Sequence, residues 1–431
     1  MAQDLADLSL VEALGSIEAG TCQAGDIVES CLDRIEALEP RVRAWQHRPD
    51  RKAFMAGWRS RQASHGQSPL KGLLVGVKDI MDTTEFPTER GSSIYRGRMA
   101  TADASCVALL RWAGAEFPGK TVTTEFAYFQ PGQTTNPHRQ THTPGGSSSG
   151  SAAAVACGMV PVALGSQTAG STIRPASYCG VVGFVPSHGL HALRGVMPLS
   201  PSFDTLGMLT RSVADAALIH RLLLDGRSDG RPDTCRPRRI LLMSGEQFGE
   251  VSPSMTSAME TVADRLKEHE VEIVQTDRLA CMDDAVATHE RIMAFEAART
   301  LASEYASRRS ELGPQLLQLL EVGQAMGLEE YLHLLERRDG MIRTYAEAVA
   351  GFDGIAAPAA PDAAPRGTDF TGSAHMSRPW QLIGVPQIAL PGLRDPNEMP
   401  LGVQLIGLTR QDERLLGLAA WFELKVFSVK A

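Results

Sequence analysis

Residues 143–174 read TPGGSSSGSAAAVACGMVPVALGSQTAGSTIR and contain two clusters of glycine and hydroxyl residues, 145–151 and 165–172. Glycine permits positive φ angles and close backbone approach, so such loops can aim several amide N–H groups at one point. The serines add hydroxyl groups in the same place. The apolar run between the clusters predicts a helix over 151–157 and a short buried strand over 161–164. The stretch therefore indicates a site for nucleophilic chemistry or for anion binding.

Three other interpretations of the first cluster remain open on local sequence. A Gly/Ser loop is often only a turn or a linker. A phosphate-binding P-loop would need a lysine followed by Ser or Thr after the glycines, whereas these glycines lead to Ser-Ser-Ser-Gly. Residues 146–150 (GSSSG) also fit the G-x-S-x-G nucleophile elbow of α/β-hydrolases. That elbow directly follows a strand, and residues 135–143 are polar and turn-like.

Composition limits the class of protein. The 431 residues are 43% hydrophobic and 21% charged, which is ordinary for a globular protein with a sizeable core. The net charge of −8 and the lack of a long basic block argue against binding to nucleic acid. The longest apolar run, 152–164, is too short to cross a bilayer. The N-terminus lacks the basic region of a signal peptide, so we expect a cytoplasmic protein with no membrane partner.

The seven cysteines are scattered and none has CxxC spacing. This pattern favours reduced thiols and argues against a zinc site. No cluster of histidine, cysteine and acidic residues suggests another metal, so we expect neither a metal nor a cofactor.

Predicted strands and helices alternate along the chain, which favours one large α/β domain over 1–431 with a central mixed sheet covered by helices on both faces. We expect loops at 59–69 and 352–365, the latter after a strand. The predicted helices cover 5–47 (two helices), 103–113, a long region at about 282–350, and 412–422, with another starting at Ser252. The predicted strands are 73–81, 181–185, 240–243, 272–274, 387–390 and 402–406.

Lys78 lies inside the apolar run 73–81. Lysine is rarely buried unless it is paired, so one interpretation places Lys78 at a strand end, paired with Asp79. The other is a desolvated lysine. Burial disfavours the charged ammonium, lowers the pKa and makes a neutral amine available as a base.

The chain resembles the amidase signature family in three segments: VGVKD (75–79), TPGGSSSGSAAAVA (143–156) and GSQTAGSTIRPASYCGVVGF (165–184). Weaker similarity is found in GKTVTTEFA (119–127) and PLGVQLIG (400–407). The resemblance runs from the N-terminal helices to the end of the chain. It implies the amidase signature fold and a hydrolase that cleaves C–N amide bonds.

The resemblance also implies a Ser-cisSer-Lys triad. Ser171 would be the nucleophile that forms an acyl-enzyme, and Lys78 would be the base. Ser147, after a cis Gly146–Ser147 peptide, would bridge them; it lies 24 residues before Ser171, which is the family spacing and favours it over Ser148. A serine hydroxyl is a weak nucleophile and needs such a base. The implied oxyanion hole consists of the backbone N–H groups of Thr168, Ala169, Gly170 and Ser171.

Arg174 lies three residues after Ser171, where the common family pattern has an arginine two residues after the nucleophile. Gln167 and Ser149 also replace the usual aspartate and glycine. The shifted arginine and Ser149 resemble the malonamidase branch, in which the arginine holds the carboxylate of a small monoamide. A planar guanidinium can bind a carboxylate through two hydrogen bonds. The alternative is a structural arginine paired with an internal acid.

These observations predict an amidohydrolase that cleaves a small carboxylate-bearing, malonamate-like amide and releases ammonia. The alternatives are a ureido-acid (allophanate-like) hydrolase, an inactive ligand-binding relative and a glutamine-hydrolysing amidotransferase A-type subunit. We expect a small-molecule amide as the binding partner and leave a homodimer open. The pocket walls are expected in helices at 285–345 and in a loop at 358–385.

Overall fold

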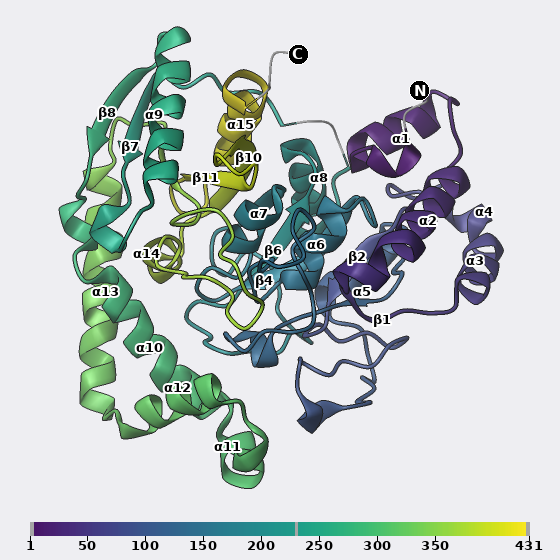
Figure 1. The fold of residues 1–431 in the computed structure, drawn as a ribbon, viewed down its shortest axis with the longest axis horizontal. Helices are drawn as coiled ribbons and strands as arrows, with labels where there is room; N and C mark the ends of the chain where they lie inside the picture. The colour runs from purple at the N-terminus through teal and green to yellow at the C-terminus, as the bar shows by residue number, and fades with distance from the viewer. Residues whose placement is uncertain (1–3, 229–231, 428–431) are drawn as a thin grey trace.

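The computed structural model describes residues 4–228 and 232–427, which form a single α/β domain around one sheet of eleven strands (Figure 1). The strands are β1 (Trp45–His47), β2 (Val75–Lys78), β3 (Lys120–Thr121), β4 (Val162–Gln167), β5 (Val182–Val185), β6 (Thr205–Thr210), β7 (Arg239–Met243), β8 (Glu272–Thr276), β9 (Gly354–Pro358), β10 (Gln387–Arg394) and β11 (Pro400–Ile406).

The sheet is mixed, with the strand order β1-β3-β2-β4-β6-β5-β10-β11-β9-β7-β8. Strand β2 is parallel to β3 and β4, and β7 is parallel to β8 and β9. The pairs from β4 through β6, β5, β10 and β11 to β9 are antiparallel. Every residue of β2, β4 and β6 is buried. Such strands need cover on both faces, which explains their continuous apolar sequence.

Helices supply that cover (Figure 1). Helices α6 and α7 contact each other on one face, while α8 and α15 contact each other against the same central strands from the other face. The described helices are α1 (Leu10–Glu18), α2 (Ala24–Val42), α3 (Arg51–Ser60), α4 (Gln62–His65), α5 (Ser105–Trp112), α6 (Ser149–Ala156), α7 (Ile173–Cys179), α8 (Val213–Leu224), α9 (Pro253–Glu268), α10 (Ala285–Thr300), α11 (Ala302–Arg308), α12 (Pro314–Ala325), α13 (Leu328–Ala348), α14 (Arg378–Ile383) and α15 (Asp412–Phe422).

The expected helical region at 282–350 is confirmed and consists of α10 to α13, at the lower left of Figure 1. Helix α10 packs against α12, α13 and α14. Gly323 of α12 makes the closest approach, because a Cβ atom there would lie 1.9 Å from the carbonyl oxygen of Ala294 in α10. These helices extend beyond the sheet and carry side chains to the site described below.

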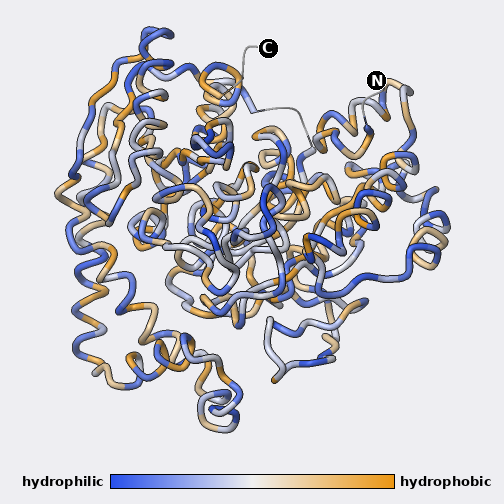
Figure 2. Tube along the Cα trace, in the orientation of Figure 1, coloured by the Kyte–Doolittle hydropathy of each residue, from blue (hydrophilic) through white to orange (hydrophobic). Residues whose placement is uncertain are grey.

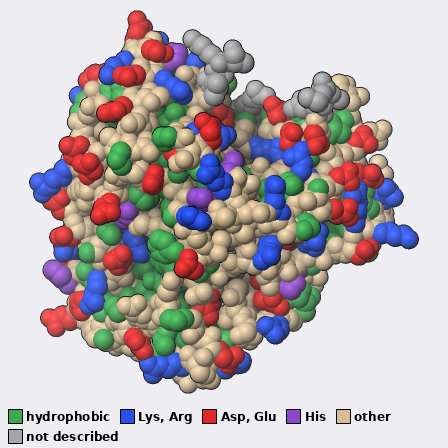
Figure 3. Space-filling view, viewed as in Figure 1, with side chains coloured by type: hydrophobic (Ala, Val, Ile, Leu, Met, Phe, Trp, Pro, Cys, Tyr) green, Lys and Arg blue, Asp and Glu red, His purple; other side chains and the backbone are tan. Residues whose placement is uncertain are grey.

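Apolar residues concentrate in the central helices and strands, and hydrophilic residues are frequent in the outer loops and helices (Figure 2). Figure 3 shows acidic and basic side chains interspersed over the visible face. Within residues 4–228 and 232–427, no helix is both long enough and apolar enough to cross a membrane.

Several predicted boundaries are wrong. Residues 45–47, expected to be helical, form β1, and helix α2 continues two residues past Pro40. The predicted loop 59–69 contains the end of α3 and all of α4. Residues 354–358 were expected in a loop but form β9, because tertiary burial overrides the weak strand propensity of alanine. Strand β6 and helix α8 were not predicted.

Candidate active site

Lys78 ends β2 and its side chain is fully buried. Its Nζ donates hydrogen bonds to Ser147 Oγ at 2.6 Å and to Ser166 Oγ at 2.9 Å. Asp79 instead pairs with Lys120, whose Nζ lies 3.2 Å from Asp79 Oδ1. The interpretation of Lys78 as the partner of Asp79 is therefore wrong, and no ion pair to Lys78 is found within the described part of the chain.

Burial lowers the pKa of Lys78 well below its usual 10.5, because desolvation disfavours the ammonium. The negative charge of Asp204 acts in the opposite direction. Two hydroxyl groups are the only polar contacts of Nζ among the described residues, and they stabilise the ammonium less than a carboxylate would. This environment suits a neutral amine that can accept a proton from Ser147.

The first glycine-rich cluster brings Ser147 to Lys78. The Gly146–Ser147 peptide is cis, as the resemblance implied. Ser148 faces elsewhere: its hydroxyl donates to the carbonyl of Ser166 and accepts from the Ser166 amide, both at 3.3 Å. The G-x-S-x-G interpretation is wrong, because that elbow directly follows a strand and the described structure has no strand between β3 and residues 146–150.

Ser166 was not among the predicted site residues. The sequence suggested a loop from residue 165, but β4 continues to Gln167 and pairs with β6. In the parallel β2–β4 pair, Val77 lies opposite Leu164, so Lys78 and Ser166 meet just beyond that pair. Knowledge of the strand register would have identified Ser166 as a neighbour of Lys78. The sequence did not indicate that register, because Gly165, Ser166 and Gln167 have little strand propensity.

The second cluster supplies Ser171 and four free amides. The backbone N–H groups of residues 168–171 have no hydrogen-bond acceptor within residues 4–228 and 232–427. Free amides in a water-poor site can stabilise a developing oxyanion. Ser171 lines the same cavity as Ser147. No hydrogen bond joins their hydroxyls in the described structure, and catalytic hydrogen bonds are often long before substrate binds.

Thr168 is held from two sides. Its hydroxyl donates to Asp204 at 2.6 Å, and its carbonyl lies 2.8 Å from Nε2 of His289. Burial lowers the pKa of His289 well below 6.5, so the ring is neutral. Arg378 Nη1 donates to Nδ1 of His289 at 3.1 Å, which leaves the ring proton on Nε2 to bond Thr168. These contacts fix the loop that carries the free amides.

Asp204 is another site residue that the sequence analysis did not identify. Its side chain is partly buried, and desolvation raises its pKa to about 6. Its Oδ2 accepts from the amides of Leu199 and Ser200 at 2.8 and 3.0 Å. Asp204 is 36 residues from Thr168 in sequence, and His289 is 121 residues away. Separations of this size leave no local pattern to recognise.

Gln167 occupies the position of the usual aspartate and stabilises the start of α7. Its Oε1 accepts from the amides of Thr172 at 3.0 Å and Ile173 at 3.1 Å. Its Nε2 donates to Oε1 of Gln381 at 3.0 Å. A neutral amide therefore satisfies the two helix-start donors next to Ser171, and Gln381 fixes its orientation.

Arg174 is buried in the first turn of α7 and lines the same cavity as Ser171. Its Nη1 donates to the carbonyl of Gly372 at 2.6 Å, and Nη2 donates to the carbonyl of Gly146 at 2.5 Å. Nε has no partner, and no carboxylate pairs with the guanidinium, among the described residues. Burial lowers the pKa of Arg174 to about 10, so it stays charged at neutral pH. The alternative of an internal acid partner is wrong.

The cavity next to these residues has a volume of about 10 Å³. This is close to the least space that holds one water molecule. Its walls are Ala127, Tyr128, Phe129, Ser147, Thr168, Ala169, Gly170, Ser171, Arg174, Leu199, Met293 and Ala374. Met293 comes from the predicted helical region and Ala374 from the predicted 358–385 loop.

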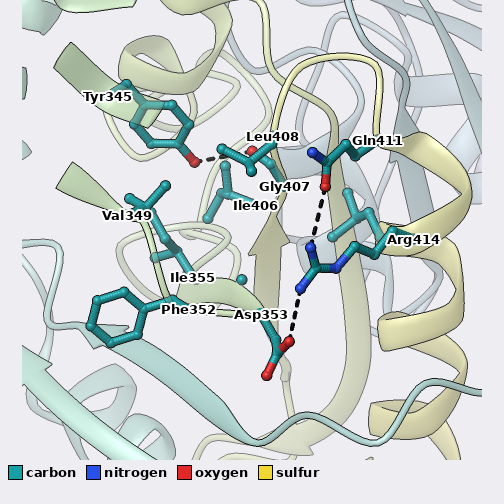
Figure 4. A pocket seen from close by; sticks show the side chains of 12 residues that line it. Tyr345, Val349, Phe352, Asp353, Ile355, Ile406, Gly407, Leu408, Gln411 and Arg414 are labelled. Atoms are coloured by element: carbon teal, nitrogen blue, oxygen red, sulfur yellow. Dashed lines mark hydrogen bonds and ion pairs between the residues drawn. The ribbon is translucent and has the colours of Figure 1, made fainter. Parts of the chain in front are cut away.

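A different pocket, between α13, β9, β11 and α15, has no comparable chemistry (Figure 4). Its polar groups are already paired: Tyr345 donates to the carbonyl of Gly407 at 3.0 Å, and Arg414 bonds Asp353 at 2.8 Å (Figure 4). Its volume is about 20 Å³ and most of its wall is apolar. We interpret it as a packing defect beneath α15.

Comparison with known proteins identifies the family of the chain. The chain is 31% identical to the A-type subunit of the glutamyl-tRNA(Gln) amidotransferase of Lachnospira eligens, covering 94% of this chain and 95% of that protein. It is also 31% identical to the putative amidase AmiD of Mycobacterium tuberculosis H37Rv, covering 96% and 92%. A crystal structure of an amidase superposes with a TM-score of 0.86 and 27% identity, covering 97% of this chain and 99% of that one.

The family assignment rests on nearly the whole chain. The sequence profile of the family described as Amidase matches residues 26–416, which include all three segments of the site. A buried lysine bonded to a serine after a cis peptide, beside free amides and a further serine, can supply the base, the nucleophile and the oxyanion donors of amide hydrolysis. The chain belongs to the amidase family and is a hydrolase of C–N amide bonds.

Proposed function

We propose that this amidase hydrolyses a small amide that carries a carboxylate, such as malonamate, and releases ammonia. The observation that carries the proposal is Arg174, a buried cation without an acidic partner among the described residues, in the wall of the cavity that Ser171 lines. Two backbone carbonyls hold the guanidinium in place and leave its charge uncompensated. A substrate carboxylate would supply the missing negative charge.

In the proposed reaction, neutral Lys78 accepts the proton of Ser147, and Ser147 accepts the proton of Ser171 as Ser171 attacks the amide carbonyl. The 2.6 Å contact between Lys78 and Ser147 supports the first transfer. The same relay returns the proton to the leaving nitrogen, and water then hydrolyses the acyl-enzyme. Ser166 holds the Lys78 amine in line from its other side.

The proposed oxyanion hole consists of the amides of Thr168, Ala169, Gly170 and Ser171, which are free of other acceptors in the described structure. Loss of one such donor typically costs about 3 kcal/mol of transition-state stabilisation. The contacts from Asp204 and His289 to Thr168 support this role, since they keep the loop in one conformation.

The test is ammonia release from malonamate, malonamide, succinamate, glutamine, allophanate and a neutral aliphatic amide. We expect Ser171→Ala and Lys78→Ala to reduce kcat by about 1,000-fold or more while circular dichroism stays unchanged. Arg174→Ala should selectively lose activity on the carboxylate-bearing amides. Arg174→Lys, which keeps the charge but loses the planar fork, should recover part of the preference. Near-normal activity of Ser171→Ala would refute the mechanism.

A second candidate is a glutamine-hydrolysing subunit, because one relative is named as the A-type subunit of a glutamyl-tRNA(Gln) amidotransferase. Glutamine hydrolysis that is weak alone and rises when partner subunits are added would favour it. A ureido-acid hydrolase would show itself by a preference for allophanate in the same panel. The displaced Arg174 favours the first proposal, since it places the cation beside the cavity that Ser171 lines.

We also propose that the protein works in the cytoplasm and can form a homodimer. Light scattering on the purified chain measures the assembly directly, and full activity of the chain alone would show that no different subunit is required. A stable larger assembly would contradict this part of the proposal.

A further inference from the structure

A second cavity, which we call the vestibule, adjoins the inner cavity because Tyr128 and Met293 line both. The vestibule has a volume of about 320 Å³, far larger than the inner cavity. It lies between α10 and α12, with the start of α14 in its wall. Its lining residues are Tyr128, Glu290, Arg291, Met293, Ala294, Gln315, Gln318, Leu319, Val322 and Arg378.

Arg378 is the unusual residue of the vestibule. Its side chain is only 7% exposed, yet its one ion pair in the described structure is a 3.5 Å contact from Nε to Oε1 of Glu290. The Glu290 side chain is 53% exposed, so this pair is loose. Nη1 donates to His289, and Nη2 has no hydrogen-bond partner among the described residues. The edge of the Arg378 guanidinium that carries Nε and Nη2 is therefore largely available to a ligand.

Two further observations indicate a polar ligand. Oε1 of Gln315, in the vestibule wall, is buried without a hydrogen-bond partner among the described residues. The Phe129 ring lies near two cations, with its centroid 5.2 Å from the guanidinium carbon of Arg174 and 6.0 Å from that of Arg378. Arg174 lines only the inner cavity and Arg378 lines only the vestibule, so the two cations serve different spaces.

We propose that the vestibule binds a second carboxylate, on the amine side of the scissile bond, through Arg378. This inference rests on the proposed function and deepens it: besides primary amides, which release ammonia, the substrates include amides of a small dicarboxylic acid with an amino acid, which release the amino acid instead. The inner cavity and the vestibule share Tyr128 and Met293, so the leaving half of a substrate whose carbonyl lies beside Ser171 can extend into the vestibule. Glu290 then acts as an internal competitor that occupies Arg378 until the substrate carboxylate arrives.

The experiment compares two amides with the same acyl group. N-malonylglycine carries a carboxylate on its amine side, and N-ethylmalonamate is its uncharged counterpart there. The readout is the ratio of the two kcat/KM values, which cancels any general effect on catalysis or folding. We expect a ratio of about 10 or more for the wild type, because hydrogen bonds between a guanidinium and a carboxylate are among the strongest in proteins.

Variants move this ratio in opposite directions. Arg378→Gln should lower the ratio about tenfold, and Arg378→Lys should lower it less, because the charge remains without the fork. Glu290→Gln should raise the ratio about threefold or more, because the competing carboxylate is removed. Glu321→Gln is the matched control: this acid on α12 pairs with Arg309, outside the vestibule lining, and its loss should leave the ratio unchanged.

The outcomes separate this inference from the proposed function. A wild-type ratio near 1, or an unchanged ratio in Arg378→Gln, would overturn the second carboxylate site even if Arg174 proves to anchor the first. An equal loss of kcat/KM for both amides in Arg378→Gln would mean that Arg378 only positions His289. This result would also overturn the second carboxylate site. Failure of the proposed function would appear separately, as no preference for acyl groups with a carboxylate.

Discussion

Lys78 determines the expected pH dependence at the scale of single residues. Only its neutral form can accept the Ser147 proton, so kcat/KM should fall as the pH drops below the pKa of Lys78. Burial lowers that pKa well below 10.5, so the acid limb should lie well below pH 10.5. A pH profile of kcat/KM measures the limb directly. A limb at the usual pKa of lysine would contradict a desolvated base.

Asp204→Asn provides a second test of the same base. The Asp204 charge raises the pKa of Lys78, so its removal should shift the acid limb to lower pH. The amide oxygen of asparagine can take the place of Oδ2, which accepts from Leu199 and Ser200, and its NH2 group can donate to the Thr168 hydroxyl, so the loop should stay in place. Asp412→Asn is the control, because Asp412 is a buried aspartate that bonds Ser187 instead of Thr168. If the acid limb of kcat/KM stays at the same pH in Asp204→Asn, the Asp204 charge does not influence the pKa of Lys78.

At the scale of elements, the close contact of α10 and α12 shapes the vestibule. Gly323→Ala should force the two helices apart, because its Cβ would lie 1.9 Å from the Ala294 carbonyl oxygen. Overpacking of this kind costs about 1–3 kcal/mol, so thermal unfolding should occur at a lower temperature. Gly340→Ala on α13 is the control, since nothing but the far end of Arg343 lies near its Cβ position.

The same variant has a functional readout. Separation of α10 from α12 would move Met293 and Leu319 apart and widen the vestibule. We therefore expect KM for an N-substituted malonamate to change more than kcat does. A change in unfolding temperature with unaltered kinetics would show that the two helices do not define the substrate path.

Element types were predictable where hydrophobic periodicity was strong. The amphipathic pattern of α9 and the continuous apolar runs of β2 and β4 are examples, because burial on one or both faces dictates these residue types. The extension of β4 through Gly-Ser-Gln and the strand β9 were missed. Their residues have little strand propensity, and pairing with neighbouring strands decides their conformation.

At the scale of the whole molecule, the N-terminal helices dock onto the domain through a buried acid. Asp215 Oδ1 of α8 accepts from the amide of Val11 in α1 at 2.9 Å, and Oδ2 has no partner among the described residues. Burial raises the pKa of Asp215 from 3.8 to about 6. Its stabilising contribution is therefore complete below about pH 4 and is lost as the pH rises through 6.

Asp215→Asn should remove this pH dependence. Asparagine keeps the acceptor for Val11 but cannot ionise, so the variant should gain stability relative to the wild type between pH 4 and 7. The upper limit of the gain is about 3 kcal/mol, from a pKa difference of roughly two units. Urea unfolding of the wild type and the variant at pH 4 and at pH 7 measures this gain in stability. A difference that is the same at pH 4 and pH 7 would contradict a raised pKa.

The candidate site could be predicted only in part, for a reason that belongs to the whole chain. Lys78, Ser147, Ser171 and Arg174 lie in short recognisable segments, and the structure brings them to one place. His289 and Arg378 come from α10 and α14, whose sequences give no sign of contact with the glycine-rich loops. Such contacts depend on how distant elements pack, which a single sequence does not encode in any local pattern.

The proposed acyl-enzyme on Ser171 sets the order of events in a catalytic cycle. The covalent intermediate forms only as the leaving nitrogen departs, and water attacks it afterwards. The first product must therefore leave before the second reactant enters, which is ping-pong kinetics. With hydroxylamine replacing water, reciprocal plots at several hydroxylamine concentrations should be parallel. Intersecting lines would mean that the amide and hydroxylamine are bound at the same time.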